Sequence, residues 1–460
     1  MSKYASVLRN LLHLTWPMLI AQVAVMANGV IDTIMAGRLS AVDLAAVGIG
    51  ASIYITIFVT VMGVLLALTP TVAQLQGGGR HEDIGEEVRQ SAWLALFLAI
   101  IAFVLLRHPE PLLALSRLTP EVETKVRAYL YAMSWSAFPA MLFRVFSGFA
   151  IGIGLPRAVM AFNLIAVALK LPMNWIFMFG TLEKFGGPQA MGGPGCAAAT
   201  AVISCFSCFL AWGWCARAVD FRPYRVFAGF SAPRPRLIFG LLKLGLPIGA
   251  TFFVDVTAFT FMALFIARLG AISSAAHQIA ANLAALTFML PLALGNAAGV
   301  LAGQALGAGD PRRARQVGLT SLVAGVSVGV LLSLTLWFGA GRIAGLYSAD
   351  SEVRRLATTL IGFVAVYHLF DALQAVAVNV LRGYKKSAMP MAIYAVALWG
   401  VGLGGGYVLG LTDWILPASG VQGFWLSAVL SLALAGGLVT AYLLRVAVDQ
   451  AKLVPTTTRT

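Results

Sequence analysis

One aspartate, Asp371, lies in the middle of a largely apolar stretch that runs from about Leu356 to Leu381. About 20 residues at 1.5 Å each are enough to cross the ~30 Å hydrocarbon core of a bilayer. An aspartate at that depth costs about 2.5–3.5 kcal/mol on insertion scales, so it is rarely found there without a use. Asp371 is therefore a candidate ion or substrate site. The alternative is a structural carboxylate that Arg382 neutralises or that hydrogen-bonds to a neighbouring helix.

Two further acids, Asp32 and Asp255, also fall inside apolar segments. Asp32 lies in the outer part of the first segment. The alternative is therefore that Asp32 lies close enough to the outer interface of the membrane to be hydrated. Asp255 lies near the middle of the seventh segment, where an acid is again expensive. Burial disfavours the charged form of a carboxyl, so such a group can exchange a proton near physiological pH or hold a monovalent cation. If Asp255 and Asp371 face one cavity, they form a Na⁺ or H⁺ site, because a cation relieves their mutual repulsion.

Other polar and aromatic side chains in the segments suggest where a substrate would bind. Asn174 follows Pro172, which loosens the backbone around it, and His277 and His368 are candidate proton relays. Polar residues also join membrane helices without any part in transport. A cavity for flat, apolar or cationic substrates would use stacking and cation–π contacts, whereas aromatic residues outside it would face lipid or the core. The candidates for lining this cavity are Phe288, Met289, Phe253, Phe259 and His368.

The composition places these segments in a membrane protein. Hydrophobic residues make up 60% of the 460 residues and charged residues 11%, whereas a soluble protein is about 25% charged. The formal charge of +14 does not indicate nucleic-acid binding, because the basic residues lie between the apolar segments, where they set orientation. All four cysteines fall in the segment 196–217. We expect them to be small buried hydrophobes rather than a metal or redox site.

Twelve apolar segments predict an all-α integral membrane protein with twelve transmembrane helices. Lys and Arg are about twice as frequent in the termini and connections of one side as in those of the other, which predicts cytoplasmic termini. The segments 45–75 and 274–306 exceed a straight crossing, so they tilt, extend beyond the bilayer, or bend at Pro70 and Pro291. The twelve segments lie near 11–36, 45–75, 91–106, 128–152, 159–180, 196–217, 238–266, 274–306, 316–340, 357–381, 388–410 and 420–445.

An internal repeat divides these segments into two halves of six. Residues 14–20 match 244–250, and residues 74–80 match 304–310, both at an offset of 230 residues. Because each half has an even number of crossings, both enter the membrane in the same direction. The sequence thus predicts two six-helix bundles related by a pseudo-two-fold axis along the membrane normal. The expected parts are an N-terminal lobe, 1–218, a basic and proline-rich cytoplasmic linker, 219–237, and a C-terminal lobe, 238–460.

No pattern in the chain suggests an enzyme, a cofactor or a nucleotide site. There is no GxxxxGK[ST] motif, and the glycines at 77–79 lack its lysine and flanking strand. Spacing suggests neither a Ser/His/Asp arrangement nor a metal-ligand set. We therefore expect a transporter, without a cofactor, that draws its energy from an ion gradient.

Four motifs resemble those of one transporter family. They are the stretch Asn28–Gly37, Val72-Ala-Gln74 followed by three glycines, Pro172-Met-Asn-Trp-Ile-Phe, and Leu381-Arg-Gly-Tyr-Lys. Together they resemble the multidrug and toxic compound extrusion (MATE) transporters, and look closest to the bacterial NorM-type branch, over nearly the whole chain. The resemblance implies a twelve-helix antiporter with two six-helix lobes. Such a protein exports cationic or amphiphilic drugs in exchange for Na⁺ or H⁺.

The resemblance also implies roles for particular residues. Asp32 and Asn174 match the acid and the asparagine of the family's N-lobe protonation site. The C-lobe cation site, a candidate for Na⁺, is matched by Tyr367, Asp371, Asp255 and Phe288. The chain departs from the family at Asp255, where glutamate is expected. One methylene fewer shortens the reach of this side chain by ~1.5 Å, which bears on whether it coordinates the ion directly.

Our interpretation is a secondary active multidrug exporter of the bacterial cytoplasmic (inner) membrane. We expect a monomer whose partners are small cationic or amphiphilic drugs and dyes and the lipid bilayer. One alternative is a flippase for lipid-linked precursors, which would need a cationic cavity for phosphate, whereas the recognisable cavity candidates here are acidic, apart from Arg144 and Lys170. An integral membrane enzyme would need a polar cluster near one interface. The major facilitator class has twelve helices too, but residues 77–89 lack its Asp-Arg-x-Gly-Arg run.

Overall fold

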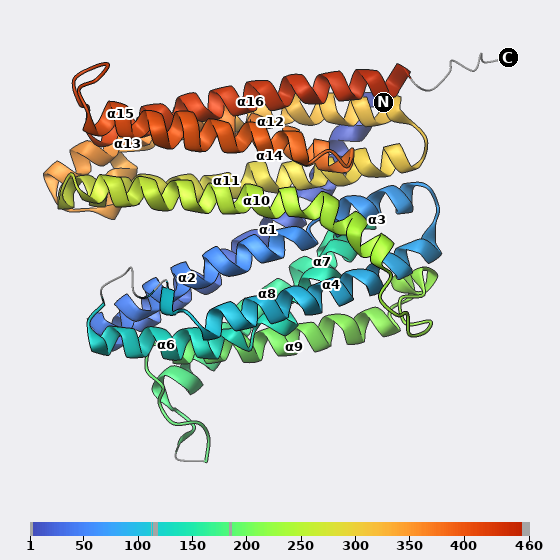
Figure 1. The fold of residues 1–460 in the computed structure, drawn as a ribbon, viewed down its shortest axis with the longest axis horizontal. Helices are drawn as coiled ribbons and strands as arrows, with labels where there is room; N and C mark the ends of the chain where they lie inside the picture. The colour runs from blue at the N-terminus through green and yellow to red at the C-terminus, as the bar shows by residue number, and fades with distance from the viewer. Residues whose placement is uncertain (1–2, 112, 114–117, 184–185, 453–460) are drawn as a thin grey trace. The chain divides into compact units, whose positions relative to one another are not determined.

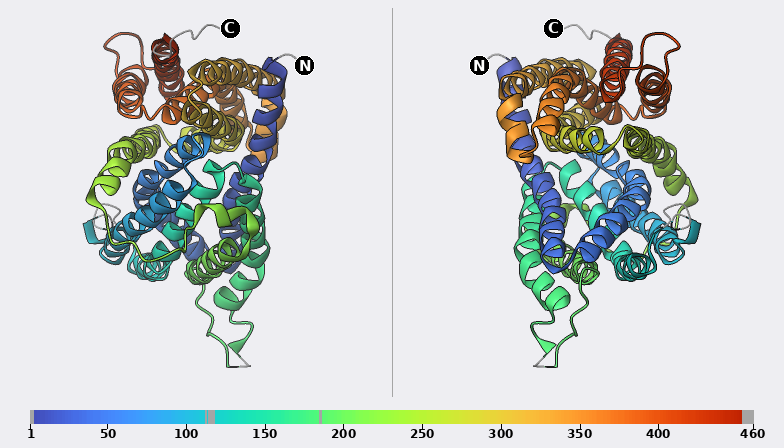
Figure 2. Two further views of the ribbon diagram at one scale, coloured as in Figure 1. Left: turned by 90° about the vertical axis from the view of Figure 1, so that its right-hand side faces the viewer. Right: turned by 90° about the vertical axis from the view of Figure 1, so that its left-hand side faces the viewer.

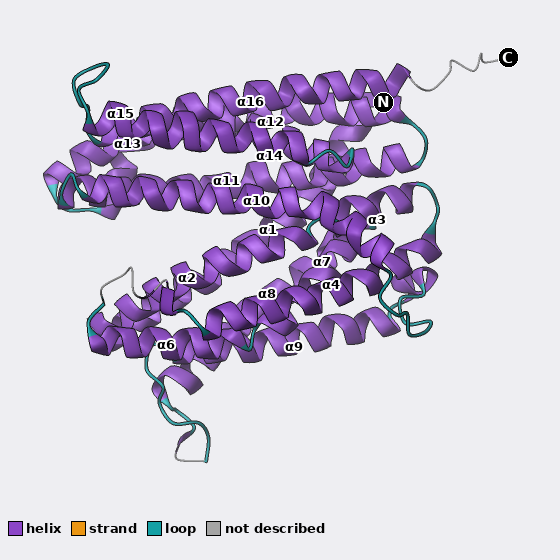
Figure 3. Ribbon diagram, viewed as in Figure 1, coloured by secondary structure: helices purple, strands orange, loops and turns teal. Residues whose placement is uncertain are grey.

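The computed structural model describes residues 3–111, 113, 118–183 and 186–452, and this part of the chain is helical without a strand (Figure 3). The first half holds α1 (Lys3–Leu39), α2 (Ala41–Leu65), α3 (Leu68–Gly77), α4 (His81–Arg107), α6 (Pro120–Ser134), α7 (Ala137–Gly152), α8 (Pro156–Phe179), α9 (Gly195–Arg217) and the 3₁₀ turn η2 (Val219–Tyr224). The second half holds α10 (Pro235–Ala267), α11 (Ala271–Gly307), α12 (Pro311–Tyr347), α13 (Ser351–Gly383), α14 (Ala388–Ala395), the π-helix η3 (Val396–Gly404), α15 (Gly405–Leu411) and α16 (Val421–Lys452).

Within the described residues, eleven helical stretches are long and apolar enough to cross a membrane. A twelfth is the pair α6 and α7, which is bent by 48° at Trp135 and Ser136. Each of the twelve predicted segments falls in one of these stretches. The prediction of an all-α membrane protein with twelve spans is thereby confirmed.

The two long segments behave differently at their prolines. The second span breaks after α2 at Leu66 and Ala67 and resumes as α3. Pro70 has no N–H to donate to the carbonyl four residues earlier, which is that of Leu66, so the helix loses a hydrogen bond at this point. In contrast, α11 continues through Pro291 as one helix of 37 residues. The break is therefore found near Pro70, whereas the second long segment is a single long helix.

The chain forms two compact units. The N-terminal unit is Pro17–Gly249, and the C-terminal unit comprises the described residues of Met1–Trp16 and Ala250–Thr460. These limits differ from the predicted lobes, 1–218 and 238–460, because the boundaries fall inside α1 and α10. Each of those helices contains a proline near its boundary. Figure 1 shows the order of the helices, and Figure 2 shows each unit from the ends of its helices, which form a bundle.

The predicted linker, 219–237, belongs to the N-terminal unit. The guanidinium of Arg89 on α4 donates to the carbonyl of Arg225 over 2.9 Å. One turn farther along α4, the indole N–H of Trp93 donates to the carbonyl of Ser231, also over 2.9 Å. These bonds satisfy carbonyls of an irregular segment. The linker is thus packed against α4 over much of its length.

Glycines let α11 and α13 approach closely in the C-terminal unit, where the two helices lie side by side (Figure 1). A Cβ on Gly299 of α11 would lie 2.5 Å from the carbonyl oxygen of Asn379, and one on Gly383 would lie 2.5 Å from the carbonyl oxygen of Gly299. Helices in membranes use such small residues to bring backbones into contact. This contact holds in place the helix that carries Asp371 and Tyr367.

We expect Gly299→Ala to destabilise the protein by about 1–3 kcal/mol, because the added methyl meets backbone that cannot move aside alone. Reversible unfolding in detergent micelles measures this loss. The matched control is Gly437→Ala on α16, where an added Cβ meets nothing within 4 Å. That change should be neutral or stabilising by up to about 1 kcal/mol. Equal stability of the two variants would contradict the close contact.

Candidate functional site

Asp32 on α1 is held in the N-terminal unit by two residues of α8. The amide nitrogen of Asn174 donates a hydrogen bond of 2.7 Å to Asp32 Oδ1, and the ammonium of Lys170 lies 3.0 Å from the same oxygen. All three side chains are buried. The structure therefore brings Asp32 and Asn174 together and adds a cation to them. Lys170 is one turn before Asn174 on the same helix face, because residues i and i+4 are neighbours on a helix.

The Lys170 ammonium has an acceptor for each of its three protons. Besides Asp32, it donates to the carbonyl oxygen of Cys196 over 3.1 Å and to the hydroxyl of Thr200. Thr200 in turn donates to the same Cys196 carbonyl over 2.9 Å. A buried ion pair is tolerated when its remaining hydrogen-bonding groups are satisfied. The charge of Asp32 is thus compensated by the protein itself.

Asp371 is buried on α13 next to His368, one turn earlier. The distance from His368 Nδ1 to Asp371 Oδ2 is 3.4 Å, which is longer than a well-formed hydrogen bond. The other ring nitrogen, Nε2, is hydrogen-bonded to the hydroxyl of Thr287 on α11. Arg382, considered above as a neutralising partner, donates instead to Asn379 Oδ1 over 3.1 Å. A histidine is therefore the polar neighbour of this carboxyl.

Asp255 on α10 has a partner of its own. The hydroxyl of Tyr394 on α14 donates a hydrogen bond of 2.8 Å to Asp255 Oδ1. Tyr394 belongs to the same buried cluster as Tyr367 of α13 and Ala258 of α10. The helices that carry Asp255 and Asp371 therefore meet in one cluster. Within it, the Tyr394 hydroxyl donates a hydrogen bond to Asp255, the side chain that is one methylene shorter than the expected glutamate.

Removing this hydroxyl with Tyr394→Phe should destabilise the protein by about 1–3 kcal/mol, because a half-buried carboxyl oxygen then loses its donor. Unfolding in detergent, compared with the wild type, measures the loss. Tyr407→Phe on α15 is the control, since that ring packs on Phe265 at 5.3 Å between centroids and no described hydrogen bond involves its hydroxyl. An unchanged Tyr394→Phe protein would show that Asp255 does not depend on this bond.

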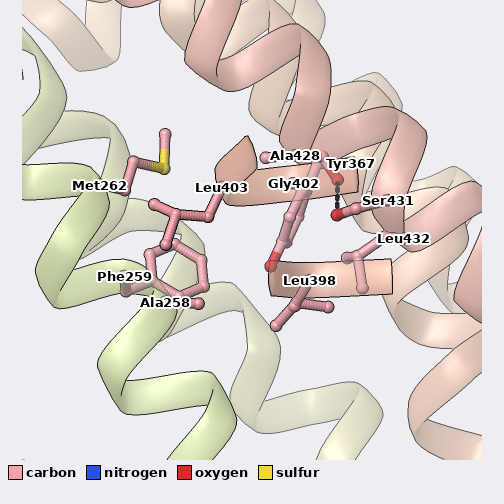
Figure 4. Close-up of a pocket in the computed structure, with 10 residues that line it drawn as sticks. All are labelled: Ala258, Phe259, Met262, Tyr367, Leu398, Gly402, Leu403, Ala428, Ser431 and Leu432. Carbon is pink, nitrogen blue, oxygen red and sulfur yellow. Dashed lines mark hydrogen bonds between the residues drawn. The ribbon is translucent and has the colours of Figure 1, made fainter. Parts of the chain in front are cut away.

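A small cavity of about 30 Å³ lies beside Tyr367 and Phe259 (Figure 4). This volume holds about two water molecules and is far below the size of a drug pocket. Of the other predicted cavity residues, Phe253 is 44% exposed and His368 is fully buried against Asp371 and Thr287. Phe288 and Met289 lie on α11, are partly buried, and do not line this cavity.

A larger cavity of about 250 Å³ lies inside the N-terminal unit, among α1, α2, α7, α8 and α9. Arg144 of α7 and Lys170 of α8 both line it, together with Asn28, Phe58 and Phe143. The sequence did not place these two cations together, because α7 and α8 are separated by a turn whose geometry spacing does not give. Over the described part of the chain, no group of three or more His, Cys, Asp and Glu residues is placed to hold a metal ion.

The chain is similar to known proteins along nearly its whole length. The MatE family model matches residues 17–176 and 247–408, once in each half. The Probable multidrug resistance protein NorM of Aromatoleum aromaticum is 40% identical over 450 residues, which cover 97% of this chain and 96% of the relative. The Multidrug resistance protein MdtK of Yersinia pseudotuberculosis is 38% identical over 437 residues, covering 95% and 94%.

Solved structures of similar fold support the same grouping. The MATE transporter NorM-NG, solved in complex with a dye and a monobody, superposes with a TM-score of 0.81 at 30% identity, covering 95% of this chain and 94% of that one. The eukaryotic MATE transporter AtDTX14 superposes with a TM-score of 0.85 at 17% identity, covering 99% and 100%, and this likeness concerns the fold alone. From the family match in both halves and the identity along nearly the whole chain, we conclude that the chain belongs to the MatE family of multidrug and toxic compound extrusion transporters.

Proposed function

We propose that the chain is a multidrug efflux transporter that exports cationic or amphiphilic drugs and dyes from bacteria in exchange for Na⁺ or H⁺. Its relatives are named multidrug resistance proteins, and the NorM-NG structure holds a dye. The observation that carries the antiport proposal is an acid buried in a membrane-spanning helix of each unit, Asp32 on α1 and Asp371 on α13. Intramembrane acids commonly mark ion pathways and proton relays.

Asp371 is the proposed site of the coupling ion. A cation that enters from outside occupies this site, with Asp255 and Tyr367 as the other oxygen groups for Na⁺. His368 lies beside the carboxyl, with Nδ1 3.4 Å from Oδ2, and histidine is a common proton relay in proteins. Binding at Asp371 shifts an equilibrium between inward-open and outward-open arrangements of the two lobes and lowers the affinity for drug. By linkage, bound drug must lower the affinity for the ion by the same factor.

Asp32 is the proposed second protonation site. When Asp32 takes a proton, the Lys170 ammonium loses the charge that compensates it and keeps its bonds to Cys196 and Thr200. An uncompensated charge in a buried site is costly. Protonation therefore favours a rearrangement of α1 against α8, which would reposition the first helix.

We also propose that the protein is a monomer with both termini in the cytoplasm.

A transport assay in proteoliposomes tests the antiport proposal. The purified protein is reconstituted with ethidium, a fluorescent organic cation, inside the vesicles, and ΔpH and ΔNa⁺ are imposed separately while efflux of the dye is followed. Efflux under one gradient and not the other identifies the coupling ion. No movement under either gradient would reject the antiporter.

A flippase for lipid-linked precursors is a second candidate function, and one observation favours it. Arg144 and Lys170 line one cavity, and a flippase needs cations for a lipid phosphate. Asp32 compensates Lys170, however, so the cavity holds less free positive charge than its lining suggests. Gradient-independent movement of a fluorescent lipid-linked phosphate between leaflets, without efflux of ethidium, would favour the flippase.

A further inference from the structure

A groove in the C-terminal unit lies between the beginning of α1 and the first half of α12, which are side by side in Figure 1. Its volume is about 530 Å³, and its lining includes Tyr4 and Leu8 of α1 and Leu319 and Val323 of α12. Both helices are long and apolar enough to cross a membrane. Val323 is 68% exposed, so this wall faces outward. The groove therefore opens to the bilayer, where the surrounding medium is lipid.

The walls of the groove present hydrocarbon rather than polar groups. The hydroxyl of Ser327 in the lining donates to the carbonyl oxygen of Val323 over 2.9 Å, and the hydroxyl oxygen of Thr320 is buried beneath the surface. At 1.5 Å per residue, the lining from 319 to 327 covers about 12 Å along α12. One leaflet contributes about half of the ~30 Å hydrocarbon core. The groove thus matches the length of one acyl chain that lies along α12.

The end of the groove at the beginning of α12 is cationic. Arg312 and Arg313 are exposed there. They precede Leu319 and Thr320 by seven residues, a separation that places side chains on the same face of a helix. Neither guanidinium forms an ion pair with an acid in the part of the chain that the structure describes. The carboxylate of Asp310 accepts a hydrogen bond of 2.8 Å from the backbone N–H of Arg313 instead. Two uncompensated cations therefore lie in line with an apolar groove.

These two parts together select the occupant. A membrane lipid supplies an acyl chain for the apolar walls and, when its head group is anionic, a phosphate for the two guanidiniums. A cationic drug would meet the same arginines and be repelled. Tyr4, which lines the groove from the first turn of α1 and is exposed, is of a residue type that is enriched at the level of lipid head groups. Both helices therefore offer a contact at this level.

We propose that the groove is a binding site for one anionic phospholipid, with its phosphodiester on Arg312 and Arg313 and one acyl chain along Val323. A guanidinium binds phosphate oxygens with two parallel hydrogen bonds. Basic pockets between transmembrane helices bind anionic head groups in this way. A zwitterionic head group fits less well, because its ammonium meets the same arginines. The bound lipid fastens the first turns of α1 to α12, and its binding does not depend on the proposed efflux function.

Native mass spectrometry of the full chain in detergent tests this proposal. The protein is titrated with phosphatidylglycerol, and separately with phosphatidylethanolamine of the same acyl chains, and the Kd of the first bound lipid is measured. We expect phosphatidylglycerol to bind about tenfold more tightly. Arg312→Gln and Arg313→Gln should each weaken it about fivefold, which is the contribution of one basic residue close to anionic lipid. Phosphatidylethanolamine should respond less than twofold to either change.

A second pair of variants tests the apolar wall without changing any charge. Val323→Trp fills the groove and should weaken phosphatidylglycerol severalfold, which keeps the test valid if an arginine variant does not fold. Its matched control is Val330→Trp, the same change two turns farther along α12 and outside the lining. Val330 is 41% exposed, so the larger side chain is tolerated there. Lipid binding by Val330→Trp should equal that of the wild type.

The control for general surface charge is Arg445→Gln. The end of α16 lies at the same end of the unit as the beginning of α12 (Figure 1), and the Arg445 side chain near it is 83% exposed. Arg445 is absent from the lining of the groove. Its removal should therefore leave the affinity for phosphatidylglycerol within twofold of the wild type.

Several outcomes would overturn the proposal. They are equal affinities for the two lipids, an equal loss in Arg445→Gln and the two groove arginine variants, and an unchanged affinity in Val323→Trp. Displacement of phosphatidylglycerol by inorganic phosphate would assign the arginines to a soluble anion instead. These results do not involve transport. Failure of the efflux function appears separately, as absence of gradient-driven ethidium movement in the wild type.

Discussion

Asp371→Asn is expected to abolish the coupling between the ion gradient and drug efflux. An asparagine neither exchanges a proton nor carries the charge that holds a cation, so drug and ion no longer affect each other's binding. Coupling free energies of about 1–3 kcal/mol correspond to about 5–150-fold changes in affinity. We therefore expect gradient-driven efflux of ethidium to fall by a factor in this range. Proteoliposomes with ΔpH or ΔNa⁺ imposed separately give the measurement.

The experiment has a matched control in the same half of the chain. Asp449→Asn removes an acid whose side chain is 63% exposed and whose surface pair with Arg445 spans 4.0 Å. Exposed pairs of this kind contribute little, so efflux should remain at the wild-type rate. Wild-type efflux by Asp371→Asn under both gradients would show that the coupling site is elsewhere. His368→Gln keeps the Asp371 carboxylate and removes its histidine neighbour, so it measures what that neighbour contributes to the coupling.

The twelve spans could be predicted from the sequence because one physical requirement fixes them. A membrane-crossing helix needs about 20 apolar residues and must satisfy every backbone group internally, so hydropathy and length suffice. One irregular place had a local signal, because Pro70 lies beside the break after α2. The bend between α6 and α7 was not predicted, since 128–152 reads as one continuous apolar segment.

Part of the candidate site could also be predicted from the spacing of residues along a helix. His368 and Asp371 are three residues apart on one helix, a separation that places side chains on one face. The contact of 3.4 Å between them could have been inferred from that spacing. Lys170 and Asn174 are four residues apart, a separation that likewise places both side chains on one face of a helix.

Contacts between helices far apart in sequence could not be predicted. Tyr394 is 139 residues after Asp255, and Lys170 is 138 residues after Asp32. Periodicity shows which face of a helix is polar but not which helix meets that face. For the same reason the sequence missed the packing of the linker on α4. The unit limits inside α1 and α10 depend on tertiary contacts that no local pattern encodes.

The pair of Lys170 and Asp32 should be the costliest buried contact to break. Lys170→Met leaves the Asp32 carboxylate without its cation, and losing one partner of a buried ion pair costs about 3–5 kcal/mol. Asp32→Asn leaves the ammonium uncompensated and should also destabilise. The double variant Lys170→Met/Asp32→Asn contains no unpaired charge. We expect it to be more stable than either single variant, because an uncharged replacement of a whole buried pair is often tolerated.

A double-mutant cycle of unfolding in detergent measures this interaction, since it isolates the term that the two residues share. The Lys170→Met loss should be smaller in acid than in alkali, because protonation removes the unpaired charge of Asp32. Additive losses in the double variant would mean that the two side chains act independently. Recovery in the double variant, together with a lost response of efflux to ΔpH, would separate the two roles of the pair. The ion pair would then stabilise α1 against α8, and the proton that Asp32 takes would be the means of breaking it.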